Sequence, residues 1–212
     1  MTDLNMPKTK VLPLAAWSRQ EGLPLDFVAV DMRKRALEIL DARVKAMNLG
    51  NVESFAGRIE EYTGACDFVV SLHACGTASD HAIEAAMAAK APYLVSPCCV
   101  GKLNLETMKG SGALQRPRSE WLSKQIGKEM YAQIAQAADR SEVSSTVDSS
   151  VSRLSKTVIE LDRNQLAMEG ACYDTSLLKM HGLEGYAKDD LLVGLPSEWM
   201  NAKGFPGNLV LH

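Results

Sequence analysis

Four short apolar runs, each followed by small or polar residues, constrain the fold of this chain more than any other feature. They span residues 25–30, 52–55, 67–72 and 93–96. The third run contains Phe68-Val69-Val70 without a polar break, which is typical of a parallel strand covered on both faces. Segments with helical spacing separate the runs, so strand and helix alternate. This order predicts an α/β domain with right-handed crossovers.

The segments between and after these runs give further expected elements. Thr77 and Asp80 form a predicted capping box for a helix that continues to about residue 90. The serine-rich residues 141–152 indicate a flexible joint. Apolar spacing predicts helices around residues 37–47, 121–138 and 151–161, and two final strands over residues 172–180 and 191–195.

Composition and charge exclude several classes of protein. The chain has 212 residues, is 46% hydrophobic and carries a net charge of −3, which gives no overall nucleic-acid footprint. No apolar run approaches the ~20 residues of a membrane span. Five cysteines in no disulfide pattern favour a reducing compartment. We therefore expect a cytoplasmic protein without disulfides or membrane contact, and interpret its basic clusters (Arg33-Lys34-Arg35; Arg116, Arg118, Lys124 and Lys128) as solvated helix faces.

The ends of the predicted strands carry the candidate site residues. In open α/β sheets, ligands bind beyond the carboxyl ends of the strands. Asp31 follows the first run, and a carboxylate there can accept both hydroxyls of a ribose. The same residue type also suits an ordinary helix N-cap. The sequence alone leaves both interpretations of Asp31 open.

His73 and Cys75 follow the third run, and they lie two residues apart, so they would share a face of an extended strand. His73 is a candidate general base, a candidate metal ligand or a core histidine. Cys75 would meet Cys98 and Cys99 if the third and fourth runs are neighbouring strands, and such ligands can bind tetrahedral zinc. Adjacent cysteines argue against one shared ion, so we predict no metal. A thiol nucleophile lacks a group to orient His73.

Small, buried and inert thiols are the commonest outcome for cysteines of this kind. We expect this of Cys66 and Cys172.

Two motifs on consecutive strand ends, SLHACGTASDHAI and SPCCVGKL, resemble a known family. They are similar to the methyltransferase domain of the glutathione S-transferase C-terminal-domain-containing protein family, in which HACG is followed by PCC one βα unit later. Downstream segments such as KEMYAQIAQAADRS and AKDDLLVGLP keep the family's order. The resemblance covers residues 25–197. Related motifs occur in a family of tRNA 2′-O-methyltransferases.

The resemblance implies a Rossmann-like class I methyltransferase sheet with helices on both faces and S-adenosylmethionine as cofactor. Asp31, with Met32 beside it, matches the acidic position that takes the ribose. Ser71 and Leu72 match the segment beside the methionine moiety. His73 follows them next to the methyl acceptor.

The turn beside adenine is implied at Gly57, Arg58 and Ile59. Many relatives of this fold have a carboxylate where this chain has Arg58. Backbone groups and Ile59 would then have to recognise the adenine.

The beginning of the chain departs from this pattern. A first strand and a glycine-rich loop should precede Asp31, yet residues 6–17 contain no GxG and residues 12–17 predict the helix that follows such a loop. We expect an N-terminally incomplete chain, with residues 1–24 as a remnant of the first helix region, 25–197 as the methyltransferase-like domain and 198–212 as a tail. A strand supplied by another chain and a degenerate module are the alternatives.

The resemblance therefore predicts an S-adenosylmethionine-dependent methyltransferase, active where the missing strand is supplied. The methyl acceptor is unknown and can be RNA, protein or a small molecule; RNA rests on analogy with the tRNA methyltransferases alone. His73 would act as base for an acceptor that must lose a proton. A non-catalytic binding module on the same scaffold, or a zinc or thiol site protein, are the alternative functions.

Overall fold

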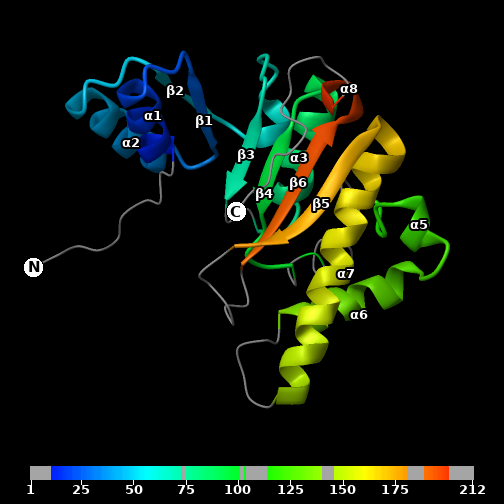
Figure 1. Ribbon diagram of the computed structural model, residues 1–212. Coiled ribbons are helices and arrows are strands. Elements are labelled where there is room, and N and C mark those ends of the chain that lie inside the picture. Colours follow the sequence, from blue (N-terminus) through cyan, green and yellow to red (C-terminus); the bar gives the residue numbers. More distant parts are fainter. Residues whose placement is uncertain are drawn as a thin grey trace, which may run out of the picture. The chain divides into compact units, whose positions relative to one another are not determined.

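The computed structural model describes residues 11–72, 75–100, 103, 114–139, 146–180 and 189–200. The chain divides into two compact units, Met1–Gly64 and Ala65–His212, whose elements are labelled in Figure 1. Among the described residues, no helix combines the length and the apolar character that crossing a membrane requires.

The first unit is a βαβ unit preceded by a helix. Helix α2 (Lys34–Ala46) connects strand β1 (Phe27–Asp31) to strand β2 (Val52–Ala56). The two strands pair in parallel, from Phe27 opposite Val52 to Asp31 opposite Ala56. Helix α1 (Val11–Gln20) precedes β1, and the 3-10 helix η1 (Ile59–Glu61) follows β2. The predicted strands and helices of this part of the chain are confirmed.

The core of the first unit lies between its two helices and its strands. Its buried residues are Leu12, Ala15, Leu37, Leu40 and Leu49. The three-residue spacings within α1 and α2 place apolar side chains on one face of each helix. Burial of these side chains, at about 25 cal/mol per Å² of apolar surface, holds the helices to the strands.

The second unit contains a mixed sheet of four strands in the order β3-β4-β6-β5. Strands β3 (Val69–Leu72) and β4 (Tyr93–Ser96) are parallel and are connected through helix α3 (Ala78–Ala89). Strand β6 (Asp190–Pro196) lies antiparallel between β4 and β5 (Tyr173–Lys179). Both predicted final strands are therefore confirmed, and they are neighbours in the sheet.

Helices make up the rest of the second unit. The helix expected over residues 121–138 is broken into α5 (Glu120–Ser123) and α6 (Lys128–Ala138), because Gly127 has an extended backbone at the start of α6. Helix α7 (Thr146–Ala171) begins within the serine-rich segment, so the prediction of a flexible joint is wrong for residues 146–152. The last described element is α8 (Ser197–Met200). In Figure 1, α7 runs beside β5.

Helices α3 and α7 cover the same face of the four-stranded sheet. The Tyr93 hydroxyl donates to Asn164 in α7 (2.9 Å), whereas the Tyr173 hydroxyl donates to the carbonyl of Ala86 in α3 (2.9 Å). The two tyrosine rings stack with centroids 5.8 Å apart, so they share a face. The predicted α/β class is confirmed. Helices on both faces of the sheet stay a prediction.

Candidate functional site

Asp31 and Gly57 lie side by side at the carboxyl ends of β1 and β2. The Gly57 N–H donates to the main-chain carbonyl of Asp31 (3.2 Å), one residue beyond the last pair of the parallel ladder. Two candidate residues separated by a whole helix in the sequence are thus brought together by strand pairing. Their role in binding a ligand stays a prediction.

The Asp31 carboxylate is oriented by Arg33, two residues further along the chain. Its Oδ1 accepts the Arg33 main-chain N–H (2.9 Å) and Nε–H (3.0 Å), and its Oδ2 accepts Nη2–H (2.8 Å). These hydrogen bonds hold the pKa of Asp31 below its usual range. Arg33, not Asp31, is the N-cap residue of α2. Asp31 and Arg33 were considered separately in the sequence analysis, and only the geometry of the turn after β1 shows that their side chains form a pair.

The turn after β2 requires glycine at position 57. A Cβ there would lie 2.6 Å from Cε1 of Phe55 and 2.8 Å from Oε2 of Glu61. The same Glu61 carboxylate accepts a hydrogen bond from the main-chain N–H of Arg58 (2.9 Å). This hydrogen bond lies at the start of the 3-10 helix η1, which contains Ile59. The Phe55 ring and the Glu61 carboxylate therefore already occupy the space that a side chain at position 57 would need.

The other predicted site residues are placed separately. Met32 is 65% exposed at the end of β1. Ser71 and Leu72 are half-buried in β3, opposite Val95 and Ser96 of β4. His73, the predicted base, lies outside the described residues, so a cleft that it shares with Asp31 stays a prediction.

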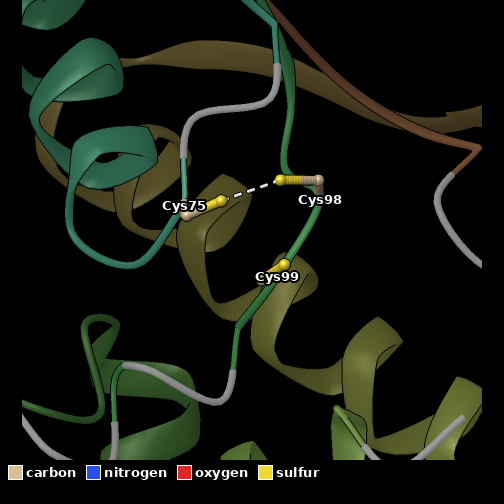
Figure 2. Close-up of side chains that lie close together, drawn as sticks. All are labelled: Cys75, Cys98 and Cys99. Carbon is tan, nitrogen blue, oxygen red and sulfur yellow. Dashed lines mark hydrogen bonds between the residues drawn. The ribbon is translucent and has the colours of Figure 1, made fainter. Parts of the chain in front are cut away.

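Three cysteines converge at the carboxyl ends of β3 and β4. The Sγ atoms of Cys75, Cys98 and Cys99 all lie within 4.8 Å of one another, and Figure 2 shows their side chains grouped between the two chain segments. Cys75 Sγ and Cys98 Sγ are 2.8 Å apart, a hydrogen-bond separation. Burial and the neighbouring Cys98 raise the pKa of Cys75 to about 12, and the same causes raise the pKa of Cys99.

The remaining two cysteines are not part of this group. Cys66 is half-buried, and Cys172 is exposed. The prediction that both are buried is therefore wrong for Cys172, which has a positive φ of 54° at the junction of α7 and β5.

A buried ion cluster forms around Asp80 in the second unit. Arg116 donates to both carboxylate oxygens of Asp80 (2.9 and 2.8 Å), and Arg163 donates to them as well (3.3 and 3.1 Å). Burial alone would raise the pKa of Asp80, but the two guanidinium groups outweigh it and hold this pKa far below its usual range. Asp80 is thus the anion of a buried cluster, and the predicted side-chain cap at Thr77 is absent.

Two members of the predicted solvated basic clusters belong to this buried network. The side chains of Arg116 and Arg118 are only 2% and 8% exposed. Arg118 also pairs with Glu84 of α3, and its main-chain N–H donates to Asp162 of α7 (2.8 Å). The interpretation as solvated faces is wrong for these two residues, because their partners lie on distant segments that local charge patterns do not reveal.

The class of protein follows from comparison with known families. Residues 12–106 match the model of a family described as "Methyltransferase domain". The matched segment contains all the strand ends that carry the predicted cofactor-binding residues. This segment is therefore similar to the methyltransferase domain family, and the resemblance inferred from the HACG and PCC motifs is confirmed.

Over most of its length, the chain is also distantly homologous to curated proteins whose name refers to a glutathione S-transferase C-terminal domain. It is 24% identical over 204 residues to the glutathione S-transferase C-terminal domain-containing protein of Bos taurus, covering 92% of this chain and 31% of that protein. The human protein is 24% identical over 168 residues (78% and 26%), and the Drosophila melanogaster homolog 28% over 170 residues (77% and 28%). The chain spans less than a third of these relatives' length.

Proposed function

We propose that this chain is the S-adenosylmethionine-binding domain of a methyltransferase with a Rossmann-like sheet. The observation that carries the proposal is the Asp31–Gly57 arrangement: a carboxylate and a glycine turn share the carboxyl edge of two parallel strands. This is the edge at which open α/β sheets bind nucleosides. The match of residues 12–106 to a methyltransferase domain supports the same assignment.

The residues present fit the nucleoside part of the cofactor. Asp31 is ionised and oriented by Arg33, and the adenine would lie beside the backbone of Arg58 and Ile59 in the turn that follows Gly57. Both oxygens of Asp31 are shared with the Arg33 side chain, which must yield one of them to the ribose. The Arg33 side chain is 76% exposed, so its displacement costs no more than about 1 kcal/mol.

The remaining roles concern the methyl acceptor. The cofactor, when bound, supplies an electrophilic methyl group to an in-line nucleophile, and positioning provides most of the rate. Ser71 and Leu72 position the acceptor and the methionine end at the edge of β3. His73 removes a proton from a hydroxyl or amine acceptor. The acceptor is RNA, a protein or a small molecule.

Calorimetric titration of the whole chain with S-adenosylhomocysteine tests the proposal. We expect one site per chain, and at least tenfold weaker binding in Asp31→Asn, because the uncharged amide accepts the ribose hydroxyls poorly. Asp41→Asn is the matched control, since Asp41 is an exposed carboxylate of α2 that accepts a hydrogen bond from the Ser54 hydroxyl (3.2 Å). Absence of binding in the unsubstituted chain, or equal losses in the two variants, refutes the assignment.

Binding and transfer are separate outcomes. A chain that binds S-adenosylhomocysteine but methylates none of RNA, protein or small-molecule extracts is a binding module on the methyltransferase scaffold. If His73→Ala leaves transfer to an identified acceptor unchanged, the role of His73 as base is wrong.

A further inference from the structure

The cysteine group has the composition and spacing of a soft-metal site. Zinc binds thiolates at about 2.3 Å, which places pairs of sulfurs in one coordination sphere about 3.8 Å apart. The three Sγ atoms lie within 4.8 Å of one another, and the Cys75–Cys98 pair is 2.8 Å apart. Small rotations of the side chains about χ1 would equalise these separations. No oxygen ligand is part of the group, which disfavours magnesium and calcium.

The backbone around the three cysteines is fixed from several sides. The Gly76 N–H donates to the Cys99 carbonyl (3.3 Å), so the segment after β3 is bonded to the segment after β4. The Gly76 carbonyl accepts Nη2–H of the buried Arg163 (2.8 Å). On the other side, the Val100 N–H donates to Asp139 (3.0 Å). Thiols held in place in this way lose little conformational entropy when they bind an ion.

The adjacency of Cys98 and Cys99 does not prevent them from sharing one ion. Adjacent side chains point to opposite faces only in an extended strand. Strand β4 ends at Ser96, and both cysteines lie in the irregular segment that follows. Figure 2 shows that the sulfur of Cys98 points toward that of Cys75, and the Sγ atom of Cys99 lies within 4.8 Å of both.

We propose that Cys75, Cys98 and Cys99 bind one zinc ion through three thiolates, with the fourth position left to a ligand from outside these residues. Three protein ligands with an open position are typical of zinc sites that take part in chemistry, whereas structural sites have four. The three thiol protons leave to solvent as the thiolates form. The site lies at the same edge of the sheet as Ser71 and Leu72.

Two measurements on the whole chain test the proposal. The chain is first stripped of metal under reducing conditions. Cobalt(II), used as a spectroscopic probe, should then bind one ion per chain with thiolate charge-transfer absorption, and zinc should displace it. Ser substitutions at positions 75, 98 and 99 should each weaken binding at least tenfold. Cys66→Ser and Cys172→Ser are the matched controls and should leave binding unchanged.

Thiol alkylation followed by mass spectrometry avoids reliance on the variants' folding. Zinc should slow alkylation of Cys75, Cys98 and Cys99 in the unsubstituted chain, but not of Cys66 or Cys172. The proposal is overturned if zinc protects none of the three. It also fails if cobalt binding needs Cys66 or Cys172.

Discussion

Arg163 and Asp80 are 83 residues apart in the sequence and meet in the interior of the second unit, with both side chains 1% exposed. Through this pair, α7 is joined to the first turn of α3. Arg163 also donates to the Gly76 carbonyl, next to Cys75. The ion cluster that holds the two helices together therefore also holds the segment that carries Cys75, one of the three proposed metal ligands.

Removal of the Asp80 charge should strongly destabilise the second unit. In Asp80→Asn, the guanidinium groups of Arg116 and Arg163 lose their shared counter-ion in a buried site, and such losses cost about 3–5 kcal/mol. Urea denaturation measures the change in unfolding free energy. Glu120→Gln breaks an exposed pair with Lys124 and should cost less than about 1 kcal/mol. Equal effects of the two substitutions would contradict this account.

Glu160 should make the second unit less stable as the pH rises. Burial, and then the nearby Asp190, raise the pKa of Glu160 to about 8 against the attraction of Lys156. The folded state thus keeps a proton that the unfolded chain, with a pKa of about 4.3, has lost. The stabilisation is complete below about pH 4 and is lost as the pH rises toward 8.

The measurement is the unfolding free energy between pH 5 and 8 for the unsubstituted chain and for Glu160→Gln. The amide resembles the neutral acid, so the variant should show a flatter pH dependence. If the unfolding free energy of the variant changes with pH as steeply as that of the unsubstituted chain, a group other than Glu160 keeps the proton in the folded state.

Gly194 should not tolerate a side chain. It lies in β6 opposite Tyr93, and a Cβ on it would be 2.1 Å from Cε1 of the buried tyrosine ring. Gly194→Ala forces the ring or the strand to move, and overpacking of this kind costs about 1–3 kcal/mol. Thermal unfolding measures the loss. Gly50→Ala, whose Cβ would meet nothing within 4 Å, is the control and should change the midpoint little.

Removal of the Arg33 side chain should favour the ligand of Asp31. Arg33→Ala frees the carboxylate oxygens that the guanidinium group occupies. Affinity for S-adenosylhomocysteine should rise by up to about fivefold, because an exposed ion pair contributes no more than about 1 kcal/mol. Calorimetry compares this variant with Asp31→Asn. A loss of affinity in Arg33→Ala as large as in Asp31→Asn would show that Arg33 itself contacts the ligand.

Local sequence patterns predicted the strands well. The apolar runs at residues 25–30 and 93–96 correspond to β1 and β4, because burial of a continuous apolar run is a local property of the chain. Apolar spacing predicted a helix from residue 151, whereas helix α7 begins at Thr146. The serine-rich composition of the preceding residues had instead indicated a flexible joint. The break at Gly127 was also missed, since apolar spacing continues across it.

The site was predictable where it depends on strand ends and unpredictable where it depends on distant partners. Parallel pairing of two predicted strands was enough to bring Asp31 to Gly57. No local pattern connects Arg116 with Asp80. The sequence of the basic residues around position 116 does not distinguish a solvated cluster from a buried one. The three cysteines were expected to meet if the third and fourth apolar runs were neighbouring strands, but their convergence on one point depends on the irregular backbone after Ser96.

The position of β6 has a consequence for the order in which the second unit is made. This strand lies between β4 and β5, and β5 contacts the rest of the sheet only through it. During synthesis, β5 leaves the ribosome before the strand that must separate it from β4. The sheet can therefore close only after residue 196 has emerged, and until then the edges of β4 and β5 that face β6 in the finished sheet have no partner and are open to pairing with other chains.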